Sequence, residues 1–338
     1  MCYFNSLVAP AGADLSIKGI TKKLPPTHKP LQSGFEYGKW PIVKSIGQDF
    51  TIESGHWELI APWVKTFKEA AAGREKFNTL NATAERLLES KLFKPAALNY
   101  RCLVLSTGFY EWRHYKPAGA KKEVAYPYFI TVQGQSLFYM AGIYQPWTDK
   151  ETGETMDTFS IVTTKANTLM EQIHNKKKRM PTILNEAQAA EWISPNLSEA
   201  KIMELAANSF GANQLSAYTL DKSFRTAPNP MEAFEYTETL AHAPARFPVQ
   251  FVVRPMTEAY HDFRGYAGKI SSGTFQVGDA IRVLPTGQES TIATIEKFES
   301  KLTHAKAGDS VVITLSTDID ISRGNTIVLA SEANAPQL

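Results

Sequence analysis

The stretch that decides the fold is RCLVLSTGFYEW, residues 101–112. Its first half is a short apolar run, its second half is aromatic, and a Thr-Gly pair separates the two. This pattern favours two consecutive β-strands. Glu111 lies between aromatic residues at the end of the second strand, where a carboxyl shielded from water by Tyr110 and Trp112 has a raised pKa. Glu111 is therefore a candidate proton donor or acceptor near neutral pH.

Runs of similar composition continue on the C-terminal side, and helical patterns are mixed among them. Residues 81–93 place leucines at helical spacing, and Asn185 can cap a helix that follows it. A mixture of this kind predicts an α+β domain built on an antiparallel or mixed sheet. The further strand-like runs are YPYFITV, SLFYMAGIY and TFSIVTT, at residues 126–132, 136–144 and 158–164.

The composition changes near residue 237. Residues 237–246 are rich in Ala and Thr, have no periodicity, and are expected to form an exposed linker. Residues 247–338 alternate short strand-like runs with turn signals such as the two Gly-Asp pairs at 278–279 and 308–309. They predict a small all-β barrel. The expected organisation is one α+β domain over residues 1–236, followed by this barrel.

The charge is distributed unevenly along the 338 residues. Residues 1–130 carry 18 Lys and Arg against 11 Asp and Glu, an excess of 7, whereas residues 244–338 carry 9 against 10. A polyanion would therefore be attracted to the first region. A solvated basic face without a ligand is the alternative interpretation.

The composition also limits the class of protein. The sequence contains no apolar run of about 18 residues that could cross a membrane, and its start lacks the pattern of a secretory signal. The two cysteines, Cys2 and Cys102, are too few for a disulfide framework or a structural zinc site. We expect a cytoplasmic protein that needs no metal or cofactor, associated with the nucleoid if it acts on DNA.

Cys2 gains distinctive chemistry from its position. Methionine aminopeptidase removes Met1 before a small residue, and the product carries an amine and a thiol on adjacent carbons. Their reference pKa values are about 7.7–8.0 and 8.5, so both reactive forms are expected near neutral pH. The amine can condense with an aldehyde, and the sulfur can then close a thiazolidine ring. Cys102 is expected to be a small buried core residue.

Two further polar residues are candidates for the same site. His174 precedes a basic run that ends at Arg179, and neighbouring positive charges favour its neutral form, which can act as a base. Asn81 begins one of the predicted helices. Each also has a structural explanation: Asn81 as a helix cap, His174 as a polar loop residue, and Glu111 as a surface ion-pair partner.

A series of motifs runs along the first two thirds of the chain. They are Cys2, W-x-L-I-x-x-W (Trp57, Leu59, Ile60, Trp63), N-A-x-x-E (Asn81, Ala82, Glu85), F-K-P (residues 93–95), G-F-Y-E-W and I-H followed by R-M-P. Taken together, the motifs resemble the SRAP family, the SOS-response-associated peptidase-like proteins that sense abasic sites in DNA. The resemblance covers residues 2–236 and preserves the order and spacing of the motifs. It implies a thiazolidine crosslink between Cys2 and the ring-opened sugar in single-stranded DNA, after autocatalytic removal of Met1.

The resemblance also assigns roles. Cys2 is the nucleophile, Asn81 positions the amine or the sugar, and Glu111 assists the proton transfers. His174 is the acid/base partner and can catalyse reversal of the crosslink. The resemblance further implies that Lys91 and Arg179 grip phosphates and that Trp63 offers a stacking surface for a base.

Several residues depart from the family pattern. Tyr3 and Phe4 follow the cysteine where Gly-Arg is usual, Thr83 replaces an arginine, and Glu58 replaces a glycine. A basic insertion, residues 176–178, separates His174 from Arg179. These departures affect DNA affinity and register, because two phosphate-binding arginines are missing, and they leave the chemistry of Cys2 in place.

Residues 247–330 resemble the barrel that follows the GTPase domain in the large subunit of sulfate adenylyltransferase, a relative of elongation factor Tu. The chain has no G-x-x-x-x-G-K-[ST] loop, so no nucleotide is expected, and the barrel is interpreted as a docking module of unknown partner. Two other functions stay open. One is an N-terminal-nucleophile hydrolase or amidotransferase, in which the α-amine is the base. The other is a non-catalytic adaptor.

Overall fold

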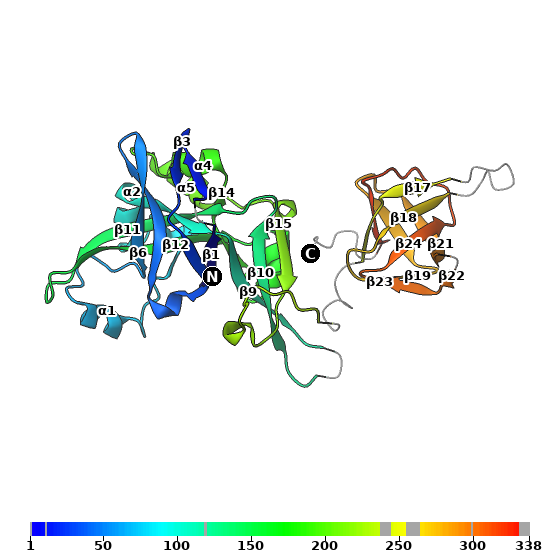
Figure 1. Cartoon of the computed structure of the whole chain (residues 1–338), viewed down its shortest axis with the longest axis horizontal. Coiled ribbons are helices and arrows are strands. Elements are labelled where there is room, and N and C mark those ends of the chain that lie inside the picture. The colour runs from blue at the N-terminus through cyan, green and yellow to red at the C-terminus, as the bar shows by residue number, and fades with distance from the viewer. Residues whose placement is uncertain are drawn as a thin grey trace. The chain divides into compact units, whose positions relative to one another are not determined.

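The chain divides into two compact units in a computed structural model that describes residues 2–10, 12–117, 120–236, 245–254, 264–298 and 300–330 (Figure 1). The N-terminal unit consists of Met1–Tyr115 and Glu123–Phe234, and the barrel unit of Lys116–Lys122 and Glu235–Leu338. Of the predicted linker, residues 237–246, the first eight residues (237–244) lie outside the described residues. Its last residue, Arg246, already begins strand β16.

One sheet of the N-terminal unit closes on itself. Strand β12 pairs in parallel with β6 and antiparallel with β11, so it joins the two ends of the path β6-β5-β8-β11. The apolar face of this closed sheet buries Trp40 and Trp57, whose indole nitrogens donate to the backbone carbonyls of Leu105 and Leu80. The strands of this sheet are β5 (Lys39–Ile46), β6 (Asp49–Trp57), β7 (Asn81–Thr83), β8 (Arg101–Ser106), β11 (Phe138–Thr148), β12 (Thr155–Lys165), β13 (Arg179–Pro181) and β14 (Ile183–Leu184).

A second sheet, in the order β15-β10-β9-β1-β4, brings the start of the chain to Glu111. Phe4 in β1 pairs with Tyr110 in β9, so the residues that precede Phe4 run alongside Glu111. Gly108 permits this packing, because a Cβ at that position would lie 2.1 Å from the ring of Phe129 in β10. The strands are β1 (Phe4–Ala9), β4 (Thr27–Ser33), β9 (Gly108–Tyr115), β10 (Val124–Val132) and β15 (Leu215–Thr219), and β2 (Asp14–Ile17) pairs with β3 (Ile20–Lys23) in a separate hairpin. The strands predicted around residues 101–112, 126–132, 136–144 and 158–164 are thereby confirmed.

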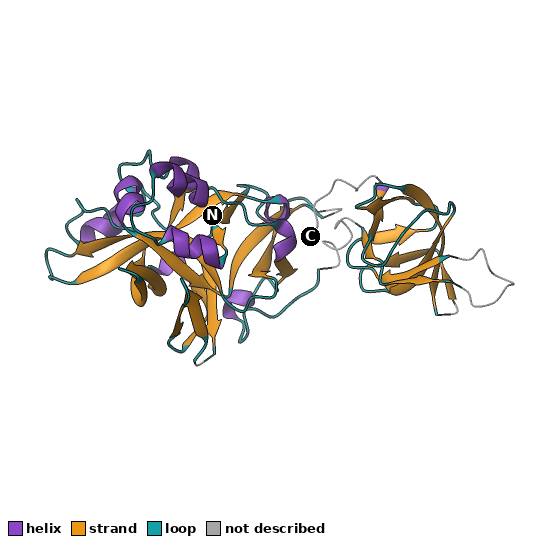
Figure 2. Ribbon diagram, turned by 90° about the horizontal axis from the view of Figure 1, so that it is seen from above, coloured by secondary structure: helices purple, strands orange, loops and turns teal. Residues whose placement is uncertain are grey.

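The helices lie on the outside of these sheets (Figure 2). Asn185 caps α4 as predicted, accepting a hydrogen bond from the backbone nitrogen of Gln188. The helices are α1 (Phe67–Gly73), α2 (Phe93–Asn99), α3 (Thr168–Ile173), α4 (Glu186–Trp192) and α5 (Glu199–Ala206), with short 3₁₀ turns at η1 (Gly34–Glu36), η2 (Ala84–Arg86), η3 (Ala212–Gln214) and η4 (Phe224–Thr226).

The predicted helix over residues 81–93 is wrong. Asn81–Thr83 form β7, which pairs in parallel with β12, and only the single turn η2 follows before α2 begins at Phe93. The helical spacing of the leucines does not decide the structure here, because pairing with β12 gives the backbone of residues 81–83 its hydrogen bonds instead. Strand β7 carries Asn81 into the N-terminal unit.

The barrel unit is built almost wholly of strands (Figure 2). Its core is apolar and contains Phe247, Phe275 and Ile281. None of the helices in the described residues is long and apolar enough to cross a membrane. The strands are β16 (Arg246–Pro248), β17 (Phe251–Val253), β18 (Gly265–Lys269), β19 (Thr274–Gln276), β20 (Ala280–Leu284), β21 (Glu289–Lys297), β22 (Ser300–Leu302), β23 (His304–Lys306), β24 (Ser310–Leu315) and β25 (Thr326–Leu329).

Candidate functional site

Cys2 lies buried at the start of β1, and its Sγ is 3.8 Å from the carbonyl oxygen of Phe4. Burial raises the pKa of the Cys2 thiol, and the negative charge of Glu111 raises it further. This shift belongs to the chain that still carries Met1, whereas the expectation of a thiol that ionises near neutral pH concerns Cys2 freed as the N-terminus and stays a prediction. While Met1 is present, the sulfur is held as a neutral thiol, because ionising it would place a second negative charge beside Glu111.

Glu111 and His174 face each other beside this cysteine. The distance from His174 Nε2 to Glu111 Oε2 is 3.8 Å, and both side chains are largely buried. Burial raises the pKa of the Glu111 carboxyl to about 7. Burial also lowers the pKa of His174 to about 4, and the charge of Arg179 contributes in the same direction. Both shifts have the direction expected from the sequence, although loss of water contributes more than the neighbouring charges.

The orientation of the His174 ring is fixed by a backbone contact. Nδ1 of His174 lies 2.8 Å from the carbonyl oxygen of Arg179, and this geometry makes Nδ1 the protonated nitrogen. The lone pair of Nε2 is then directed towards Glu111. Near neutral pH the Glu111 carboxyl therefore gains or loses a proton while the His174 imidazole beside it stays neutral.

Asn81 is a buried amide whose hydrogen-bonding groups are unused in the described part of the chain. Its side chain is 6% exposed, and neither its nitrogen nor its oxygen has a hydrogen-bond partner among the described residues. Strand β7 holds it in register with Ile161 of β12. The same segment contacts the start of the chain, because Asn78 Nδ2 donates to the hydroxyl of Tyr3 at 3.2 Å. A buried amide that lacks protein partners is suited to bind a polar ligand.

Arg179 lies close to the pair, but its guanidinium has other partners. Nη1 donates to Glu85 Oε1 at 2.7 Å, and Nη2 donates to the carbonyl oxygen of Thr163. These contacts hold strand β13 against β12. The inserted lysines are also engaged, since Lys176 pairs with Glu123 and Lys178 lies 3.9 Å from Glu171.

A cleft of about 680 Å³ lies on the N-terminal unit and contains Trp63 and Lys91, but not Cys2, Glu111 or His174. Two aromatic side chains stand out at its surface: Trp63 is 60% exposed and Phe77 is 71% exposed. Asn78, which bonds to Tyr3, also lines the cleft, so the cleft borders the start of the chain. The basic residues that line the cleft are Arg74, Lys76, Arg86 and Lys91.

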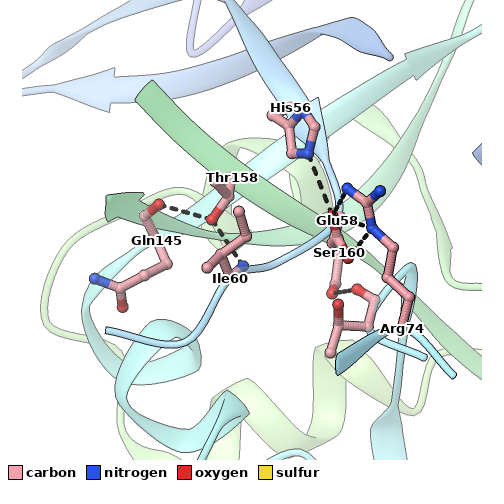
Figure 3. Close-up of polar contacts among 8 residues, drawn as sticks. His56, Glu58, Ile60, Arg74, Gln145, Thr158 and Ser160 are labelled. Carbon is pink, nitrogen blue, oxygen red and sulfur yellow. Dashed lines mark hydrogen bonds and ion pairs between the residues drawn. The ribbon is translucent and has the colours of Figure 1, made fainter. Parts of the chain in front are cut away.

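Glu58 forms a buried ion-pair cluster in the wall of this cleft. Figure 3 shows its carboxylate between His56 and the guanidinium of Arg74, which donates to it at 2.7 Å from Nη2 and at 3.0 Å from Nε. Burial opposes ionisation, but hydrogen bonds from His56 and Arg74 keep the pKa of Glu58 below its usual value. Arg74 also stacks on the ring of Tyr37, 3.5 Å from its centroid. The segment after Glu58 is braced in the same view, where the backbone nitrogen of Ile60 donates to the hydroxyl of Thr158.

The sequence motifs located Trp63 and Lys91 but missed the remainder of the cleft. Phe77, Lys76 and Arg74 follow directly after α1 and stand in no motif, and folding brings them to the same cleft as Trp63 and Lys91. Glu58 was visible only as a departure from the family pattern. In the described residues, no three His, Cys, Asp or Glu side chains are grouped so as to hold a metal ion.

Comparison with known proteins gives different relatives for the two units. A family profile described as SOS response associated peptidase (SRAP) matches residues 33–226, more than half of the chain. The abasic site processing protein YoqW of Bacillus subtilis (strain 168) is 31% identical over 173 residues, which cover 51% of this chain and 70% of YoqW. A crystal structure of a protein from Bacteroides thetaiotaomicron covers 69% of this chain and 100% of its own, with a TM-score of 0.58 and 32% identity.

The barrel unit is similar to part of a different protein. Sulfate adenylyltransferase subunit 1 of Salmonella newport (strain SL254) is 39% identical over 127 residues, which are 37% of this chain. The match covers 26% of that protein, so only a barrel-sized part of it is shared.

Proposed function

The chain belongs to the SOS response associated peptidase (SRAP) family, and on that premise we propose that it captures abasic sites in single-stranded DNA as a covalent adduct at Cys2. The observation that carries the proposal is the meeting of three groups at the start of the chain. Cys2 lies within the electrostatic reach of Glu111, and Glu111 faces the neutral ring of His174. A nucleophile and an acid/base pair near neutrality are what capture of an aldehyde requires.

The proposed reaction begins with the removal of Met1. Water hydrolyses the peptide bond between Met1 and Cys2, releasing methionine and freeing the Cys2 amine. The amine adds to the aldehyde carbon of the ring-opened sugar, and loss of water gives an imine. The Cys2 sulfur then adds to the same carbon while the thiol proton passes to the nitrogen. This step closes the five-membered thiazolidine ring. Over the whole sequence, one water is consumed in releasing methionine and one water is released in forming the imine.

Glu111 suits the proton transfers in this sequence. Because its pKa is raised to about 7, both its acid and its carboxylate form are populated near neutral pH. The acid form can protonate the hydroxyl that leaves as water, and the carboxylate can then take a proton from the amine or the thiol. His174 is neutral at that pH because its pKa is lowered to about 4, and its Nε2 can relay a proton to or from Glu111.

Asn81 and the cleft supply the binding contacts of the proposal. Both amide atoms of Asn81 lack protein partners among the described residues, so they can bond to the sugar or the amine. The exposed rings of Trp63 and Phe77 offer surfaces on which unpaired bases can stack, while Lys91 and its basic neighbours attract the phosphates. A duplex keeps its bases stacked inside, which favours a single strand as the partner.

Two measurements on the purified full-length chain test this function. The intact mass shows whether Met1 is lost and whether the new terminus is unblocked. A denaturing gel then shows whether a stable adduct forms with single-stranded DNA that contains one abasic site, and the same strand without that site is the matched control. Loss of Met1 with no adduct on abasic DNA contradicts the proposal and favours an N-terminal-nucleophile hydrolase.

A further inference from the structure

Arg225 is an exposed cation held on a platform of three aromatic rings. Its guanidinium carbon lies 4.6 Å from the ring centre of Phe4, 5.2 Å from that of Trp112 and 5.9 Å from that of Phe224. We call these three rings the aromatic shelf. The shelf is itself packed, because the rings of Phe4 and Trp112 meet edge to face at 5.0 Å and Phe224 stacks on buried Tyr110 at 5.3 Å.

In the described part of the chain, the charge of Arg225 is not neutralised by a carboxylate. Among the described residues no acidic side chain forms an ion pair with it, whereas Arg74 and Arg179 are each bound to a glutamate. A guanidinium that stacks through its face keeps its N–H groups free in the plane of the group. Those N–H groups form a fork that matches phosphate oxygens, and the shelf restricts the side chain before a ligand arrives.

The shelf is built on the two paired strands that lead to the proposed nucleophile and carry the proposed acid. Phe4 is two residues from Cys2, a separation of about 7 Å along an extended strand. Trp112 directly follows Glu111 in β9, so the two side chains point to opposite faces of that strand. The sugar of an abasic nucleotide carries a phosphate on each side, and binding at the shelf requires that one of these two phosphates reaches Arg225.

We propose that Arg225 binds a phosphate that flanks the abasic nucleotide, as a positioning residue that fixes the strand beside Cys2. The proposal rests on the proposed function and deepens it. It also accounts for Phe4, which stands where the family pattern has an arginine. The guanidinium that covers the Phe4 ring comes from η4, a segment more than 200 residues away in the sequence, and returns a positive charge to the same place.

Binding of single-stranded DNA that carries a tetrahydrofuran analogue of the abasic site tests the proposal, since this probe cannot form an adduct. We expect Arg225→Gln to weaken binding about tenfold, the loss of one charge-assisted contact. The plot of log affinity against log salt becomes shallower by about 0.7, the value for one phosphate contact in a single strand. Arg225→Lys retains the positive charge but not the planar stacking, so its affinity should fall less than that of Arg225→Gln. Arg323→Gln removes an exposed arginine that covers Phe251 in the barrel unit, and as the matched control it changes neither quantity.

A second arm identifies the phosphate. Uncharged methylphosphonate replaces, one at a time, the two phosphates that flank the analogue. At one of these positions the methylphosphonate should lower the affinity of the unsubstituted protein about tenfold. It should not lower the affinity of Arg225→Gln any further at that position. Equal binding and equal salt dependence of Arg225→Gln and the unsubstituted protein overturn the proposal, as does an undiminished methylphosphonate effect at both positions in the variant. Failure of the proposed function is a separate result, because it is the absence of an adduct with authentic abasic DNA.

Discussion

The two units of the chain both enclose their cores with β-sheet, yet they treat buried polar groups differently. Among the described residues of the barrel unit, the buried polar side chains are Arg246 and Ser272. The N-terminal unit buries many more, including Glu58, Asn81 and Glu111. Burial of a polar or ionisable group costs free energy unless partners compensate it. The N-terminal unit bears the larger cost of burying polar groups, so the catalytic site is expected in that unit.

Within the N-terminal unit, the partners of each group separate structure from function. Arg101 is buried, and its guanidinium donates to the backbone carbonyls of Ala97, Leu98, Trp192 and Ser194. It thereby ties the end of α2 to the end of α4. Asn81 is buried to a similar degree and has no such partner in the described part of the chain. The hydrogen bonds of Arg101 are those of a structural residue. The unused hydrogen-bonding groups of Asn81 are those of a residue that can bind a ligand.

The largest effect is expected when each of the two cysteines is replaced in turn. Cys2→Ala should abolish the heat-stable adduct with abasic single-stranded DNA, because both the thiol and its ring closure are lost. Cys2→Ser should lose it as well, since a hydroxyl does not close a comparably stable ring. Cys102→Ser is the matched control, a second buried cysteine in β8 that should leave the adduct yield unchanged. Full crosslinking by Cys2→Ala on a denaturing gel would show that the adduct forms elsewhere.

The next largest effect concerns the proton transfers. Glu111→Gln and His174→Ala should slow crosslinking by about 10- to 10⁴-fold, the range for a positioned acid or base. The Glu111 carboxyl donates its proton below its pKa of about 7, so the rate assigned to this step falls as the pH rises through that value. Glu111→Gln should remove this fall of the rate at high pH, the alkaline limb of the pH–rate profile. Single-turnover crosslinking at a series of pH values measures that profile. An alkaline limb that persists in the variant would assign it to another group.

The sequence predicted the strands far better than it predicted the segment that carries Asn81. Residues 101–112 are an apolar run and an aromatic run separated by Thr-Gly, as two consecutive strands require, and they form β8 and the start of β9. Residues 81–93 have leucines at helical spacing, but parallel pairing of β7 with β12 overrides that local preference. The pairing joins residues about 80 positions apart, and such a contact leaves no trace in a local pattern.

The candidate site divides in the same way. Cys2, Glu111 and His174 stand in recognisable motifs, and local composition was enough to predict the direction of the pKa shifts of Glu111 and His174. The raised pKa of the Cys2 thiol was not predictable, because it depends on burial at the start of β1 and on Glu111 in a different strand. Phe77 and Arg225 were missed for the same reason, since each matters only through the surface that folding builds around it.

A smaller effect is expected at the cleft. Lys91→Glu should weaken binding of single-stranded DNA about equally for all base sequences, because phosphate contacts carry no sequence information. It should also make the salt dependence shallower. Arg179→Glu is the instructive comparison: it breaks the contact with Glu85 and disturbs the carbonyl that orients His174, so it should lower the crosslinking rate as well. Fluorescence anisotropy and single-turnover crosslinking separate the two effects, and equal losses of affinity and rate in both variants would contradict the distinction.

The smallest effect should come from removing the barrel. Residues 244–338 carry 9 basic and 10 acidic side chains, so this part of the chain offers DNA no net attraction. In its described part the buried residues are apolar apart from Arg246 and Ser272, and its hydrophobic core is built of its own residues, among them Phe247 and Phe275. A chain that ends at residue 236 should therefore fold, lose Met1 and crosslink abasic DNA within tenfold of the full-length rate. Thermal unfolding checks the first point, intact mass the second and single-turnover crosslinking the third. A loss greater than tenfold in a folded protein, about 1.4 kcal/mol of barrier, would place part of the active site or the DNA path in the barrel and remove the contrast between the units.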